Sequence, residues 1–279
     1  ILSCYHKDLK LLSRRLTFRN VRERVNKLED TIYNYSIDLG YKNAITLQEL
    51  KDELIEIRDI VVNDHQSLYL NEINSLINRI HLFGYYFATL DIRQDSRIHH
   101  EVFTTVIDHL IKTNHPSFPK NYHDLSEEEQ IKILSNVDTT NLIAIDGFED
   151  EMVSNTLKTI QVIKQIQESN GELGANRYII SNNQTALNVI QLFAMLKMVA
   201  FQDNLTVDVV PLFETITDLE NAQPVMEQLY NNPAYISHLR SRGSKQTIML
   251  GFSDGTKDGG YLMANWGIYT AKEKLTEIS

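Results

Sequence analysis

Two acidic residues, Glu214 and Asp254, each follow an apolar run that is typical of a short buried β-strand. The strand expected at residues 207–213 ends just before Glu214, and the strand expected at 247–252 ends just before the turn that carries Asp254. The sequence between the acids leaves room for a helical return, so neighbouring strands of a parallel barrel would bring both carboxylates to one edge. Two carboxylates there suit Mg²⁺, which takes one or two protein oxygens and leaves its other positions to water and substrate.

The segment that carries Asp254 also holds a cation and several glycines. Lys257 would oppose negative charge on a phosphorylated or enolate-forming substrate. The backbone of the segment can come close to such a substrate because side chains are missing at Gly255, Gly259 and Gly260.

Each of these residues also has a plainer structural interpretation. Glu214 would favour the N-terminus of the helix that follows, for which Thr217 and Glu220 form the expected cap. The Ser-Asp-Gly sequence around Asp254 is common in turns, and Lys257 would be a solvated lysine. The pairing of the two acids is what favours a metal site over a helix cap and a turn.

Arg93 directly follows a third expected strand, at residues 85–92. An arginine at a strand end can bind phosphate with two parallel hydrogen bonds. The alternative is a structural ion pair with Asp91 or Asp95, and strand alternation puts residues 91 and 93 on the same side.

Three segments resemble the phosphoenolpyruvate carboxylase family and occur in that family's order. They are FATLDIRQDSRIHHEVF at 87–103, PLFE at 211–214 and GFSDGTKDGG at 251–260. Residues 177–193 and 5–16 resemble the family only loosely. The resemblance is therefore specific from about residue 83 onward.

The resemblance implies a cytoplasmic, carbon dioxide-fixing lyase that makes oxaloacetate and phosphate from phosphoenolpyruvate and bicarbonate. It implies Mg²⁺ or Mn²⁺ as cofactor, with Glu214 and Asp254 as metal ligands. It implies that Arg93 and Lys257 bind substrate, with Lys257 also catalytic, and that the complete enzyme is a homotetramer that supports the tricarboxylic acid cycle. The family's TAHPTE and GRGG segments are not in this sequence, so we expect a central fragment that is inactive alone.

Two other functions stay open from the residues alone. One is another Mg²⁺-dependent enzyme with a phosphoenolpyruvate/pyruvate barrel, and bicarbonate dependence would separate it from a carboxylase. The other is a non-catalytic helical scaffold, in which the acids cap helices. The adjacent His99 and His100 are expected to pack or to face solvent, because neighbouring helical positions point about 100° apart and rarely share one ion.

The expected fold is a helix-rich α/β structure, a partial parallel (β/α) barrel with extra helices. Residues 1–82 form the expected helical segment, and 83–279 form the expected part of the catalytic barrel. Capping boxes begin helices at Thr46 with Glu49 and at Ser126 with Glu129. Further helices are expected at 66–82 and 148–169, and a strand is expected at 178–181.

Composition limits the class of protein. The 279 residues are 42% hydrophobic and carry a net charge of −10, which disfavours nucleic acid or an anionic membrane as a partner. The single cysteine, Cys4, cannot form an internal disulfide and fits a reducing compartment. The sequence contains no apolar run of about 18 residues and no signal peptide, which favours the cytoplasm.

Overall fold

The computed structural model describes residues 1–38, 40–140 and 142–279. These residues divide into two compact units. The first contains Ile1–Thr89 together with Ile166–Gly174, and the second contains Leu90–Gln165 together with Ala175–Ser279.

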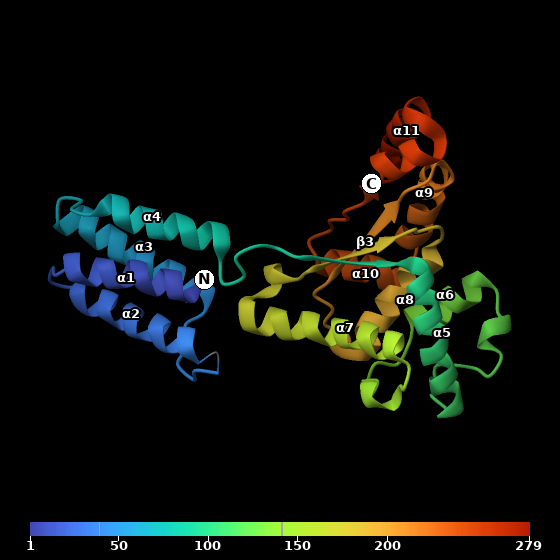
Figure 1. Ribbon diagram of the computed structural model, residues 1–279, viewed down its shortest axis with the longest axis horizontal. Coiled ribbons are helices and arrows are strands. Elements are labelled where there is room, and N and C mark those ends of the chain that lie inside the picture. The colour runs from blue at the N-terminus through green and yellow to red at the C-terminus, as the bar shows by residue number, and fades with distance from the viewer. Residues whose placement is uncertain (39, 141) are drawn as a thin grey trace. The chain divides into compact units, whose positions relative to one another are not determined.

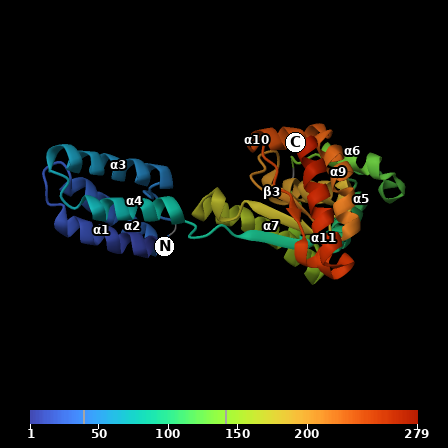
Figure 2. The ribbon, with the colours of Figure 1, turned by 90° about the horizontal axis from the view of Figure 1, so that it is seen from above.

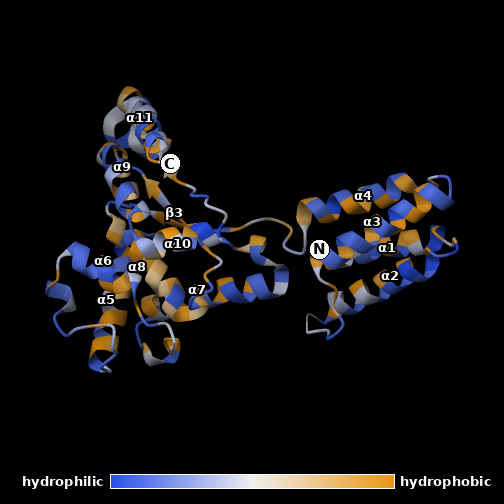
Figure 3. Cartoon of the chain, turned by 180° about the vertical axis from the view of Figure 1, so that it is seen from behind, coloured by the Kyte–Doolittle hydropathy of each residue, from blue (hydrophilic) through white to orange (hydrophobic). Residues whose placement is uncertain are grey.

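The main part of the first unit is a bundle of helices. They are α1 (Leu2–Arg15), α2 (Arg22–Ile37), α3 (Leu47–Asp64) and α4 (Leu70–Phe83) (Figures 1 and 2). Each helix alternates between apolar and polar stretches (Figure 3), as expected when one face is buried and the other is solvated.

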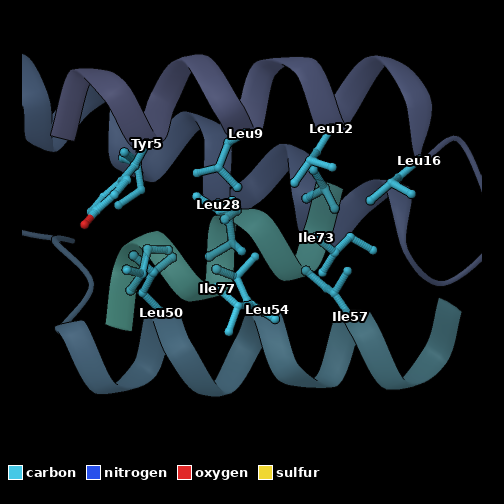
Figure 4. Packing of buried hydrophobic residues seen from close by; sticks show 14 of the residues in the cluster. Tyr5, Leu9, Leu12, Leu16, Leu28, Leu50, Leu54, Ile57, Ile73 and Ile77 are labelled. Carbon is cyan, nitrogen blue, oxygen red and sulfur yellow. The ribbon is translucent and has the colours of Figure 1, made fainter. Parts of the chain in front are cut away.

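The core of this bundle is aliphatic. Tyr5, Leu9 and Leu12 recur at helical spacing along α1 and point toward residues such as Leu54 and Ile77 on the facing helices (Figure 4). All of these side chains are buried, and each fully buried leucine or isoleucine stabilises the fold by about 1.5–3 kcal/mol. The Tyr5 hydroxyl donates a buried hydrogen bond of 2.7 Å to the carbonyl of Gly84.

Helix α3 begins where it was predicted, and helix α4 begins later than predicted. The capping box predicted at Thr46 and Glu49 is confirmed, with both reciprocal hydrogen bonds formed. Helix α4 begins at Leu70, later than the predicted 66. The reason is that Gln66, Ser67 and Tyr69 have φ values of 52°, 60° and 61°, which a right-handed helix does not allow.

The second unit contains a parallel sheet. Within the described residues it has four strands: β1 (Asp91–Asp95), β2 (Arg177–Ser181), β3 (Asp208–Phe213) and β4 (Met249–Leu250). Their order in the sheet is the same as their order in the chain, and every pairing is parallel. The predicted helix-rich α/β class is confirmed at this level.

Helices connect the strands and cover them. After β1 come α5 (Ser96–Lys112), α6 (Glu127–Ser135) and α7 (Glu151–Asn170); after β2 comes α8 (Ala186–Leu196), which continues as a π-helical turn (Lys197–Phe201). After β3 come α9 (Ile216–Tyr230) and α10 (Pro233–Ser241), and after β4 comes α11 (Phe252–Glu277). Short 3₁₀ turns lie at Tyr122–Asp124, Ile145–Gly147 and Glu172–Gly174. Helix α8 is the most deeply buried, because it packs against β3 and against three other helices, α5, α6 and α9.

Two strand predictions need correction. The strand expected at 85–92 lies instead at Asp91–Asp95, because Phe87 has a φ of 66° and interrupts any extended run before it. The strand expected at 247–252 is reduced to Met249–Leu250, because Phe252 already begins α11. Asp254 therefore lies in the first turn of a helix and not in a loop at the end of a strand.

Of the helix predictions for this unit, two are confirmed and one is wrong. The capping box at Ser126 and Glu129 is confirmed, and α7 matches the helix expected at 148–169 within a few residues. The cap of α9 was predicted at Thr217 and Glu220, and this is wrong. The capping pair is Thr215 with Asp218, two residues earlier. None of the described helices is long and apolar enough to cross a membrane.

Candidate functional site

An ion pair joins two of the predicted site residues across the sheet. Arg93 lies in the middle of β1, and Glu214 directly follows β3. The Arg93 Nη2 atom is 2.7 Å from Glu214 Oε1, and the two side chains are 49% and 17% exposed. The half-buried carboxylate is thus held by a guanidinium that solvent still reaches.

The expected structural alternative for Arg93 is wrong, because neither neighbouring aspartate is its partner. Asp91 pairs with Arg177 at 2.8 Å, and Asp95 pairs with Arg97 at 2.8 Å. The Arg97 guanidinium, through its hydrogen bonds, holds the pKa of the Asp95 carboxyl below its usual range.

The second oxygen of Glu214 is held by the turn that follows β2. The backbone N–H of Asn182 donates to Glu214 Oε2 at 2.8 Å. Asn182 adopts a left-handed φ of 52°, which asparagine tolerates better than most residues. The buried Ser96 Oγ donates to the Asn182 carbonyl at 2.6 Å and so fixes this turn.

Glu214, which follows β3, is therefore held by a side chain from the middle of β1 and by the backbone of the turn that follows β2. Sequence reasoning missed Ser96 and Asn182 as parts of this arrangement. The signal that was available was the Asn182–Asn183 pair directly after a strand, because asparagine favours left-handed turns.

The glycine-rich segment packs directly against the backbone of Glu214. The Gly251 N–H donates to the Phe213 carbonyl at 2.8 Å. A Cβ atom on Gly251 would lie 3.1 Å from Glu214 Cα, and one on Gly255 would lie 3.4 Å from the Glu214 carbonyl oxygen. Glycine at these positions lets the start of α11 approach the end of β3.

Asp254 and Lys257 form a second, more exposed pair. Lys257 Nζ is 3.2 Å from Asp254 Oδ1, with side chains that are 75% and 47% exposed. An exposed pair at this spacing on a helix contributes little to stability. In the part of the chain that the structure describes, no ion pair or hydrogen bond links this pair to Arg93 or Glu214.

The two predicted metal ligands, Glu214 and Asp254, are carboxylates that keep free oxygen lone pairs. No group of three or more His, Cys, Asp or Glu side chains among residues 1–38, 40–140 and 142–279 is arranged to hold a metal. The two carboxylates match the one or two that Mg²⁺ usually takes from protein. Each Glu214 oxygen accepts one hydrogen bond and keeps a further lone pair, and Asp254 uses only Oδ1.

The histidine pair at the start of α5 is structural, as predicted. His99 is fully buried, its ring centroid lies 5.3 Å from that of Tyr178, and neither ring nitrogen has a hydrogen-bond partner among the described residues. Burial lowers the pKa of His99 to about 4, so the ring is neutral at pH 7. His100 is exposed, with Nδ1 3.3 Å from Gln191 Nε2.

Comparison with known proteins agrees with these motifs. The family model described as phosphoenolpyruvate carboxylase matches residues 2–279. The chain is also similar to a phosphoenolpyruvate carboxylase of Nitrosomonas eutropha, with 32% identity over 238 residues. That alignment covers 81% of this chain and 25% of the relative, so the chain spans about a quarter of the length of the curated relative it matches.

Proposed function

Because this chain belongs to the phosphoenolpyruvate carboxylase family, we propose that its second unit supplies part of a carboxylase active site at the carboxyl edge of its parallel sheet. The observation that carries the proposal is the convergence on Glu214, at the end of β3, of a donor from neighbouring parallel strand β1 and a donor from the turn after β2. Ligand sites of open parallel sheets occur at this edge. The proposed reaction moves the phosphoryl group of phosphoenolpyruvate to bicarbonate, and carboxylation of the remaining enolate gives oxaloacetate and phosphate.

Arg93 and Lys257 would bind the anionic groups of the substrate. The Arg93 guanidinium has five N–H donors and uses only Nη2 for Glu214, so the others can bind phosphate oxygens. The ion pair also holds the guanidinium at the sheet edge before substrate arrives. Lys257 is 75% exposed and has a flexible stem, so it can turn from Asp254 toward an incoming anion.

Glu214 and Asp254 would hold the divalent metal, Mg²⁺ or Mn²⁺. Such a metal, when bound, supplies Lewis-acid neutralisation of negative charge on a substrate oxygen. The chain itself contributes the half-buried position of Glu214, the Asn182 amide that orients this carboxylate, and the glycines that let the start of α11 pack against the Glu214 backbone.

We also propose that the sheet continues beyond β4 toward a barrel. The strands are parallel and in chain order, as in a (β/α) barrel. A groove of about 720 Å³ runs along β4 and α11, lined by apolar residues such as Ile248 and Leu250 and by polar ones such as Asn265 and Lys272. A further strand with an apolar inner face would fit beside β4 there. Assembly as a homotetramer in the cytoplasm, as the resemblance implies, is part of the same proposal.

The test measures oxaloacetate formation from phosphoenolpyruvate by the full-length protein with Mg²⁺, with and without bicarbonate. We expect bicarbonate-dependent product, and a loss of about 10²-fold or more in kcat in Glu214→Gln and in Asp254→Asn, because each removes charge at the site. Glu220→Gln is the matched control, since Glu220 is an exposed acid on α9, six residues after Glu214.

Bicarbonate-independent turnover of phosphoenolpyruvate would favour another enzyme of the phosphoenolpyruvate/pyruvate barrel group. Equal activity in all three variants would favour the scaffold, in which Asp254 only stabilises the first turn of α11. Residues 1–279 alone are expected to give no oxaloacetate, and detectable bicarbonate-dependent product from them would contradict that part of the proposal.

A further inference from the structure

The first amide of α9 is satisfied by a residue from a distant part of the chain. The N-terminal amides of a helix have no partner within the helix. In α9, Thr215 Oγ1 accepts from the Asp218 N–H at 3.1 Å, and the Asp218 carboxylate accepts from Thr215 N–H at 2.9 Å. The Ile216 N–H takes no part in this capping box. It donates instead to Asp258 Oδ2 at 2.9 Å, and Asp258 lies 42 residues further along the chain.

Close packing accompanies this hydrogen bond. A Cβ atom on Gly259 would lie only 2.5 Å from Ile216 Cγ1, so α11 touches the start of α9 where a side chain is missing. The next residue, Gly260, has non-helical angles of φ 79° and ψ 168°. Residues 252–259 are thus a short helical segment, distinct from the rest of α11, that ends on Ile216.

The segment 252–259 is fixed at both of its ends, on either side of Glu214. At its start, the Gly251 N–H is bonded to the Phe213 carbonyl. At its end, Asp258 is bonded to the Ile216 N–H. Asp254 and Lys257 lie between these two anchors, so their place is set relative to the residue with which Asp254 would share a metal. Figures 1 and 2 show α11 beside α9 in both views.

We propose that Asp258 is a positioning residue, which holds the segment 252–259 so that Asp254 faces Glu214 before a metal binds. This inference rests on the proposed function of Glu214 and Asp254. Asp258 is exposed and its second oxygen has no partner among the described residues, so its contribution is the single acceptor that anchors the segment. An asparagine keeps an acceptor oxygen, whereas an alanine removes it.

The experiment measures Mn²⁺ affinity of the full-length protein by electron paramagnetic resonance of the free ion, which needs no turnover. Asp258→Ala is expected to weaken Mn²⁺ binding by about 10-fold, as loss of a group that orients a ligand typically does. It should also speed amide exchange in peptides that cover 252–259. Asp258→Asn is expected to bind Mn²⁺ like the wild type.

Asn232→Ala is the control for general destabilisation. Asn232 accepts from the first amides of α10 at 3.0 and 3.1 Å, so its loss also uncaps a helix of the second unit, away from the segment 252–259. We expect this variant to be less stable with unchanged Mn²⁺ affinity. Equal weakening by Asp258→Ala and Asn232→Ala would overturn the positioning role, as would an Asp258→Asn variant as weak as Asp258→Ala.

Asp254→Asn separates this inference from the proposed function. If Asp254→Asn weakens Mn²⁺ binding and Asp258→Ala does not, the metal site stands and the positioning role is wrong. If Asp254→Asn binds Mn²⁺ like the wild type, the metal site is wrong and the role of Asp258 falls with it.

Discussion

Replacing Gly259 by alanine would test how tightly the start of α11 rests on α9. The new Cβ atom would lie 2.5 Å from Ile216 Cγ1 and 3.0 Å from its Cδ1. Because carbon atoms pack best at about 3.5–4.0 Å, one partner has to move by about 1 Å. Overpacking of this kind costs about 1–3 kcal/mol, and the better helix propensity of alanine returns about 0.5–1 kcal/mol. We therefore expect Gly259→Ala to destabilise the second unit by about 1–2 kcal/mol.

A second-site change identifies the cause. Ile216→Ala removes the two closest atoms that the new Cβ would meet and leaves Met263 Cβ at 3.3 Å, so Gly259→Ala should cost much less in that background. Gly260→Ala is the matched control, because a Cβ there meets nothing within 4 Å but is strained by a φ of 79°. Its cost of about 1–3 kcal/mol comes from the backbone and should persist when Ile216 is alanine.

The assay is the urea dependence of amide exchange in peptides from α9 and α11. This readout is local, which matters because a chain of two units need not unfold in a single step. The reasoning is refuted if Gly259→Ala costs the same with Ile216 as with alanine at that position. It is also refuted if Ile216→Ala rescues Gly260→Ala equally well.

Two further predictions concern buried polar groups. Burial lowers the pKa of His99 from 6.5 to about 4, so between these pH values the unfolded chain binds more protons than the folded chain. The free energy of unfolding of the second unit should therefore fall by up to about 3 kcal/mol as the pH falls from 6.5 to 4. His99→Phe should flatten this pH dependence of unfolding, and an unchanged slope would contradict the prediction. In the first unit, Tyr5→Phe leaves the Gly84 carbonyl without its buried donor and should cost about 1–2 kcal/mol in amide exchange of the bundle, whereas Tyr33→Phe, at an exposed position, should change nothing. Equal effects of the two tyrosine changes would show that the hydrogen bond to Gly84 is not the cause.

Local signals were the most reliable guide to the elements. The capping boxes at Thr46 and Ser126 were predictable because both partners of each box lie within one helical turn. Strand β1 was misplaced because its residues are mostly charged and partly exposed, and only its pairing with β2 makes it a strand. An apolar pattern search therefore selected the residues before it.

In the candidate site, too, the sequence indicated candidate residues but not the contacts between residues that are distant in the chain. Motifs were enough to select Arg93, Glu214, Asp254 and Lys257, but the partner of Arg93 could not be chosen from its neighbours. Glu214 becomes that partner only when β1, β2 and β3 are placed side by side. The hydrogen bond from Ile216 to Asp258 was out of reach for the same reason, since it joins two elements that no sequence period relates.

The first unit is made of two separate segments of the chain, and this has a consequence for synthesis on the ribosome. Its helices α1–α4 emerge before the second unit, but Ile166–Gly174 also belong to it, and the Tyr35 hydroxyl donates to the Ser169 carbonyl at 3.1 Å. Residues 90–165, which include β1, α5 and α6, are therefore synthesised before the bundle can form its last contacts. This intervening stretch is about as long as the bundle itself. A nascent chain halted before residue 166 should hold a bundle with an open flank, which makes this interval the time when the first unit is most exposed to proteases and to chaperones.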